Sequence, residues 1–177
     1  MRVLEPIQRW STAATLRREH FLAQHTHPFL VHALGTLTKL DPSKVDDLTT
    51  DRLVVERPRQ MLGDAMMVVE LAPRDIDQNR ITIGVTPGCD VVLDDASVSK
   101  RHAWFDSVGE TWRIWDDDSS AGTQVNGEGL AARTPRVLTS GDTIALGYVE
   151  VMFFTTESFY ELIRGLYSTA AGAVIAD

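Results

Sequence analysis

Two kinds of hydrophobic pattern divide the chain. From residue 65 onward, short runs rich in β-branched and aromatic residues recur between turn residues such as Asn126-Gly127. Short strands closely spaced by turns are typical of an all-β sandwich, and Asn-Gly favours a tight hairpin because both residues tolerate positive φ. The expected strands cover residues 66–71, 80–84, 91–93, 102–106, 111–116, 123–125, 136–138, 143–146 and 149–154.

The N-terminal part has a helical pattern instead. Ser11 or Thr12 can cap a helix over residues 13–24, and Pro28 ends it because the residue before a proline avoids the helical region. The apolar run that follows, residues 29–34, fits either a strand or a helix. The apolar face of this segment is larger than one free helix can hide, so it packs on the sandwich with the C-terminal helix, or it binds another chain.

A second helix is expected at the C-terminal end. Thr155 or Thr156 can cap it, and Glu157 lies near its positive end. One face carries the apolar residues Phe159, Leu162, Ile163 and Leu166. The fold class predicted is an all-β sandwich of two antiparallel-rich sheets, with an N-terminal helical extension and a C-terminal helix. The predicted domains are an N-terminal helical segment, a connector, a β-sandwich, and a C-terminal helix with its tail, at residues 1–35, 36–64, 65–156 and 157–177.

Composition and charge exclude several classes of protein. The net charge is −8, and residues 61–177 hold eight basic and 18 acidic side chains. Non-specific nucleic-acid binding needs many cations, so no nucleic-acid partner is expected. No apolar run approaches the roughly 18 residues of a membrane span, and the chain has a single cysteine, Cys89, which we expect to be buried. We therefore expect a cytoplasmic protein.

An ordered series of motifs narrows the interpretation. Its members are Ile83-Gly84 and residues 89–95, 97–103, 112–116, 119–127 and 138–147. In this order and spacing the series resembles the forkhead-associated (FHA) domain, and the resemblance covers roughly residues 66–156, about half of the chain. It implies a sandwich of two β-sheets whose loops read phosphothreonine in partner proteins, a task for which a phosphate needs several fixed donors.

Two of the family's donors are replaced in this chain. Val85 stands where the family has arginine, and Ala121 stands where it has asparagine. The serine is kept as Ser99, a cation follows it as Lys100, and Ser120 occupies the usual threonine position. The candidate partner or phosphopeptide site is therefore Val85, Ser99, Lys100, Arg101, Ser120 and Ala121. The resemblance assigns support of the loops to Gly84, His102, Gly122 and Asn126, with the His102 ring bracing the phosphate loop from behind.

The predicted function is a non-catalytic protein–protein interaction module, an adaptor or assembly component of bacterial type, with a degenerate phosphothreonine site. One alternative is a phosphothreonine-dependent adaptor downstream of a Ser/Thr kinase, which would use Ser99, Lys100 and Ser120. Another is a structural subunit of a larger complex. The partner is a protein, with or without phosphothreonine. The oligomeric state is left open.

Other clusters of chemical groups have structural explanations. The four histidines at 20, 25, 27 and 32 lack a familiar zinc spacing, so no metal is expected. Asp116-Asp117-Asp118 is either a cation site or a strand end in which a carboxylate ties the next loop to itself, and we favour the second. No nucleophile beside a base and no phosphate-cradling glycine loop is present outside the FHA pattern, so neither an enzyme nor a cofactor is expected.

Overall fold

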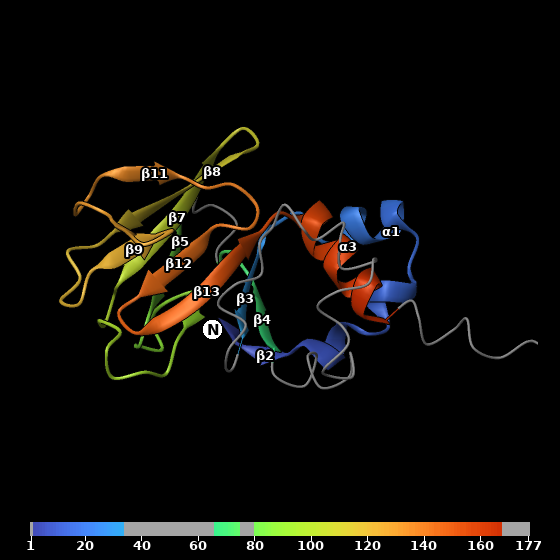
Figure 1. The fold of residues 1–177 in the computed structure, drawn as a ribbon, viewed down its shortest axis with the longest axis horizontal. Coiled ribbons are helices and arrows are strands. Elements are labelled where there is room, and N and C mark those ends of the chain that lie inside the picture. The colour runs from blue at the N-terminus through green and yellow to red at the C-terminus, as the bar shows by residue number, and fades with distance from the viewer. Residues whose placement is uncertain (1, 34–65, 75–79, 168–177) are drawn as a thin grey trace, which may run out of the picture.

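The computed structural model describes residues 2–33, 66–74 and 80–167, which form a β-sandwich with a helical layer at one end (Figure 1). The expected connector at 36–64 and the tail at 168–177 lie outside these residues. The first sheet has six strands, in the order β1 (Arg2–Val3), β6 (Val91–Val92), β5 (Arg80–Gly84), β7 (Ala103–Val108), β8 (Thr111–Asp116) and β11 (Pro135–Val137).

The second sheet has seven strands and brings the N-terminal part of the chain into the sandwich. Its order is β10 (Glu128–Gly129), β9 (Thr123–Val125), β12 (Thr143–Leu146), β13 (Val149–Phe154), β3 (Phe29–Ala33), β4 (Met66–Glu70) and β2 (Glu5–Pro6). All its pairs are antiparallel, and in the first sheet only β1–β6 and β5–β6 are parallel. The predicted fold class is confirmed.

Strand β3 lies within residues 1–35, where an N-terminal helical segment was expected, and yet it belongs to the seven-stranded sheet. It lies between β13 and β4, with Val31 opposite both Met152 and Val68. The apolar run that fitted either element is therefore a central strand. A strand that is buried on both faces of its sheet has a continuous run of hydrophobic residues, which explains why the pattern at residues 29–34 fitted either a strand or a helix.

The N-terminal helix is shorter than the sequence predicted, so the expectation of one helix over 13–24 was wrong in extent. The segment forms two short 3₁₀ helices, η1 (Ile7–Trp10) and η2 (Ala13–Thr15), and then α1 (Arg18–Gln24). The break falls at Leu16 and Arg17, which have extended backbone with ψ of 152° and 141°. The Leu16 carbonyl accepts a hydrogen bond from the Tyr160 hydroxyl at 2.7 Å, so tertiary contact replaces the helical bond.

The C-terminal helix α3 (Thr156–Tyr167) begins where its cap was predicted. The Ser158 backbone N–H donates to Thr155 Oγ1 at 3.3 Å. None of the helices within the described ranges is long and apolar enough to cross a membrane.

Two hydrophobic cores share the seven-stranded sheet. One lies between the sheets and includes Phe105, Ile114 and Phe153. The other lies between the sheet and the helices, where the rings of Phe29 and Phe159 stack with centroids 4.0 Å apart. The N-terminal segment packs against α3 in this second core, as one of the two alternatives predicted (Figure 1).

We expect Phe159→Ala to destabilise the protein by about 3–5 kcal/mol, because it opens a cavity in the fully buried second core. Urea unfolding followed by circular dichroism measures the change. Val108→Ala is the matched control, since this side chain is 62% exposed and its loss should change stability by less than about 0.5 kcal/mol. Equal unfolding midpoints for the two variants would show that the helical layer does not contribute to folding.

Candidate functional site

Three loops and one hairpin turn meet at one end of the sandwich, which we call the recognition end. They are residues 85–90, 93–102, 117–122 and the turn at 147–148. Hydrogen bonds join them: Val85 N–H donates to the Ser99 carbonyl at 3.0 Å, and Gly147 N–H donates to the Gly122 carbonyl at 3.2 Å. The candidate residues from distant parts of the sequence therefore share one surface.

His102 is fully buried and connects two of these loops. Its Nδ1 accepts a hydrogen bond from the Ser99 N–H at 3.0 Å, so the ring proton lies on Nε2, which is 3.1 Å from the Gly122 carbonyl oxygen. Burial lowers the pKa of His102 below 6.5, although the Gly122 carbonyl and Asp116 act in the opposite direction. The neutral imidazole is thus the form that fits both loops.

Ser99 and Ser120 face each other across the recognition end. The Ser120 N–H donates to Ser99 Oγ at 3.0 Å, and both residues reach solvent. Lys100 is exposed beside them, and its carbonyl accepts a bond from Thr86 Oγ1 at 2.8 Å. The site therefore presents a hydroxyl and an ammonium group on a backbone whose conformation is held from behind.

The two replaced positions lie on the same loops but offer no polar side chain. Val85 is half-buried against the inter-sheet core, and Ala121 is exposed. Gly84, just before Val85, packs so closely on the Lys100 carbonyl that a side chain there would clash with it. The loop backbone is therefore closely packed here, while neither Val85 nor Ala121 offers a hydrogen-bond donor.

Asp116 holds the 117–122 loop in shape. One of its carboxylate oxygens accepts from the Ser119 N–H at 2.9 Å, and the other accepts from the hydroxyls of Ser119 and Thr123 at 2.5 and 2.6 Å. Burial acts to raise its pKa, but these hydrogen bonds outweigh burial and the pKa lies below 3.8. This arrangement is the loop-tying role favoured from sequence. In the described part of the chain, no group of three or more His, Cys, Asp or Glu side chains is arranged to hold a metal ion.

Two further predicted site residues have their own partners. Arg101 is exposed and forms an ion pair with Asp117 at 2.8 Å. Asn126 bonds to Asp142 and to the Thr143 N–H at 2.8 and 2.9 Å, so it fixes the β9–β10 hairpin to the strand entry at β12 and not to the Ser99 loop.

Tyr148 is a residue of the recognition end that the sequence reasoning missed. Its side chain is 90% exposed, and its N–H donates to Ser97 Oγ at 2.8 Å. A Cβ on Gly147 would lie 2.6 Å from the Ser97 carbonyl oxygen, so the turn packs tightly on the 93–102 loop. An aromatic residue directly after a glycine in a hairpin was the available signal.

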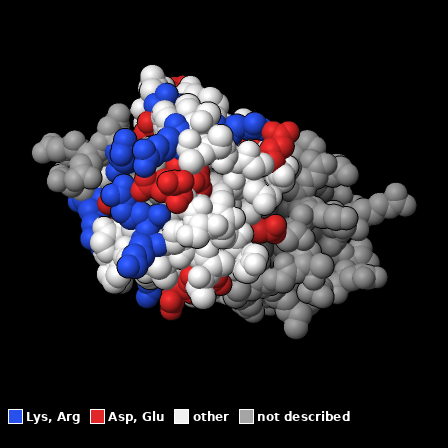
Figure 2. Space-filling model, turned by 90° about the vertical axis from the view of Figure 1, so that its left-hand side faces the viewer, with Lys and Arg blue, Asp and Glu red and all other residues white. Residues whose placement is uncertain are grey.

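Figure 2 shows one face of the molecule, on which basic side chains gather toward one edge with carboxylates among them. The charge on this part of the surface therefore differs from that of the chain as a whole, whose net charge is −8.

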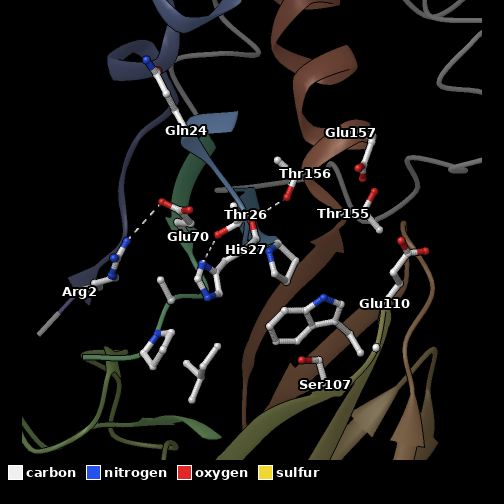
Figure 3. Close-up of a pocket in the computed structure, with 16 residues that line it drawn as sticks. Arg2, Gln24, Thr26, His27, Glu70, Ser107, Glu110, Thr155, Thr156 and Glu157 are labelled. Atoms are coloured by element: carbon white, nitrogen blue, oxygen red, sulfur yellow. Dashed lines mark hydrogen bonds and ion pairs between the residues drawn. The ribbon is translucent and has the colours of Figure 1, made fainter. Parts of the chain in front are cut away.

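A larger cavity of about 880 Å³ lies away from this end, between the sandwich and the helices (Figure 3). There the Arg2 guanidinium points to Glu70 at 3.4 Å, and the Thr156 hydroxyl bonds to the His27 carbonyl at 2.9 Å. None of the site residues predicted from sequence lines it. Burial lowers the pKa of His27, which helps to keep this ring neutral within the cavity.

Comparison with known proteins agrees with the geometry. The FHA domain family matches residues 81–147. The chain is 35% identical over 96 residues to the oxoglutarate dehydrogenase inhibitor of Corynebacterium jeikeium, which is 51% of this chain and 65% of that protein. It is also 35% identical over 98 residues to the glycogen accumulation regulator GarA of Mycolicibacterium smegmatis, 52% of this chain and 60% of that protein.

One similar solved structure is the FHA domain of an Arabidopsis thaliana hypothetical protein, with 24% identity and a TM-score of 0.47 over 73% of this chain and 86% of that one. The match covers less than two thirds of the length of the Corynebacterium and Mycolicibacterium relatives. The FHA family model matches residues 81–147, which lie within the two-sheet sandwich, so this part of the chain is similar to an FHA domain in both sequence and fold.

Proposed function

We propose that this protein is a phosphothreonine-dependent adaptor that acts downstream of a Ser/Thr kinase. The observation that carries the proposal is the Ser99 hydroxyl, which lies 3.0 Å from the Ser120 amide on two loops joined by His102. A dianionic phosphate needs donors held in advance of binding, and this end supplies the Ser99 hydroxyl and the Lys100 ammonium.

The curated relatives support regulation as the role. One is named an inhibitor of oxoglutarate dehydrogenase and the other a regulator of glycogen accumulation, and both match the part of the chain that holds the FHA domain. A regulator without catalytic groups acts by binding, so we assign this protein a protein partner that carries a phosphorylated threonine.

The absence of donors at Val85 and Ala121 lowers the expected affinity for a phosphopeptide. A hydrogen bond to a charged group contributes roughly 1.5–3 kcal/mol, so the loss of two weakens binding by about 3–6 kcal/mol, roughly 100-fold to more than 10,000-fold. Phosphopeptide binding at Ser99 therefore depends on cations elsewhere on the same surface. Lys100 and Arg101 are the nearest in sequence, and both are exposed.

A second candidate function is binding of an unphosphorylated partner by the same loops. Val85 and Ala121 favour it, because neither side chain can donate a hydrogen bond to a phosphate. The structural-subunit alternative needs a constant partner, which stoichiometric co-purification would reveal. The following experiments separate these functions.

Ser99→Ala should weaken binding to phosphothreonine peptides by at least about 10-fold, because it removes a direct hydroxyl contact to a charged group. Titration against a degenerate phosphothreonine peptide library, beside its unphosphorylated counterpart, measures this. Ser107→Ala, which lines the distant cavity, is the matched control and should bind like the wild type. Equal binding of the two libraries by the wild type would instead support an unphosphorylated partner.

The double substitution Val85→Arg with Ala121→Asn should tighten phosphopeptide binding roughly 100-fold or more, since it restores two donors on loops whose backbone is already in place. Isothermal titration with peptides selected from the library gives the affinity. A wild type that binds no phosphopeptide while the double variant does would show that the frame persists without its original function. No gain in the double variant would mean that the loops do not present these positions to a phosphate.

His102→Gln should cost about 1–3 kcal/mol of unfolding free energy at neutral pH, because a buried brace between two loops is lost. The pKa of His102 is lowered in the folded state, so its contribution is complete above about pH 6.5 and declines as the pH falls through the folded pKa. The difference between wild type and variant should therefore shrink in acid. His27 titrates in both proteins and cancels.

Guanidinium chloride unfolding over a pH series measures this difference. A gap that stays constant from about pH 8 to about pH 5 would contradict a neutral, buried His102 as the brace.

A further inference from the structure

Three arginines line a second pocket next to the recognition end. Arg74 follows β4, Arg80 begins β5 and Arg101 precedes β7, and together they border a cavity of about 590 Å³. Residues 61–177 hold only eight basic side chains, so three of them meet at one place in an acidic part of the chain. The fold, and not the overall charge, creates this concentration.

The only carboxylate lining this pocket, among the described residues, is committed to the backbone. Asp90 accepts hydrogen bonds from the Arg74 N–H at 2.9 Å and from the Thr82 N–H and hydroxyl at 2.8 and 2.7 Å. Both of its oxygens are thereby used. Counting only the described residues, the pocket has an excess of positive charge, and its arginines have N–H donors for an outside anion.

Each of the three guanidinium groups is positioned by a contact with a described residue that leaves some of its N–H donors unpaired within the described part of the chain. Arg74 Nη2 donates one bond, to the Pro87 carbonyl at 2.7 Å. Arg80 lies over the Trp104 ring at 4.5 Å, a contact that occupies its face and leaves its N–H edge available. Within the described part of the chain, no carboxylate forms an ion pair with Arg80. Arg101 pairs with Asp117, but its side chain is 60% exposed, and such surface pairs are weak enough to exchange.

The pocket adjoins the loop that carries Ser99. Thr86 lines the pocket and bonds to the Lys100 carbonyl at 2.8 Å, so the pocket wall also fixes the residue beside Ser99. Arg101 belongs to both places, since it lines the pocket and contacts Asp117 of the 117–122 loop. The pocket and the Ser99 loop therefore share Arg101 as a common residue.

We propose that this arginine pocket binds a second anionic side chain, phosphorylated or acidic, of the same partner segment that places its phosphothreonine at Ser99. The inference rests on the proposed function. Arginine pairs with phosphate or carboxylate through two parallel hydrogen bonds, so the pocket suits such a second group. The partner class is thus a phosphothreonine segment with a neighbouring phosphate or carboxylate.

The test uses peptide libraries with a fixed phosphothreonine. In each library one other position, at a defined distance from the phosphothreonine, is alanine, glutamate or phosphoserine, and this position is moved along the peptide from library to library. At one or more offsets, phosphoserine should tighten binding to the full chain about 10-fold or more over alanine, with glutamate between them. The arms with glutamate and phosphoserine distinguish an acidic from a phosphorylated group. Fluorescence anisotropy of labelled peptides gives the affinities.

Arg74→Gln combined with Arg80→Gln should abolish this gain, while binding of the alanine series stays at the wild-type level. Arg136→Gln is the control of equal charge change, since Arg136 pairs with Glu128 on β11 and lines neither pocket. Because Arg80 also packs on Trp104, Arg74→Gln alone provides a second variant that leaves this contact intact.

Two outcomes overturn the inference and can be told apart. Libraries that bind with no preference at any second position, or a gain that survives in both arginine variants, refute the arginine pocket alone. Failure of every phosphothreonine library to bind refutes the proposed function, and the second subsite with it.

Discussion

The recognition end depends on one buried, neutral imidazole. His102 accepts a hydrogen bond from the Ser99 amide on one side and bonds to the Gly122 carbonyl on the other, so the β6–β7 loop and the β8–β9 loop are held at a set separation. Around this brace, Asp116 shapes the 117–122 loop, and the close approach of Gly84 to the Lys100 carbonyl shapes the Ser99 loop. The conformation of these loops is thus held independently of the exposed side chains that they carry.

Because backbone contacts hold these loops, the exposed side chains on them can vary without loss of the fold. Val85 and Ala121 offer no hydrogen-bond donor, while the hydrogen bonds that join the loops are in place. Under the proposed function, the charge that attracts an anionic partner comes from nearby cations. Arg101 lies in the 93–102 loop and, with Arg74 and Arg80, lines the adjoining pocket. Affinity would then depend on a wider cationic surface instead of a single phosphate pocket.

Much of the sandwich could be predicted from sequence because its strands alternate and its turns carry Asn-Gly and Gly signals. Asn126 and Gly127 indeed take φ of 54° and 80°. The strand at residues 29–33 could not be predicted from sequence, because a strand that is buried on both faces lacks the alternation of apolar and polar residues. The 13–24 helix was overestimated because α3 engages the Leu16 carbonyl, a contact that no local pattern contains. The motif series predicted the members of the loop site, whereas Arg74 and Tyr148 entered only through three-dimensional proximity.

The most direct test of phosphothreonine binding at these loops is to follow the amide chemical shifts of the full chain during titration with a selected phosphothreonine peptide and with the same peptide unphosphorylated. If the loops bind the phosphate, the Ser99, Lys100 and Ser120 amides shift strongly with the phosphopeptide alone, because these groups surround the phosphate. The same shifts with both peptides, or shifts confined to surfaces away from these loops, would contradict it.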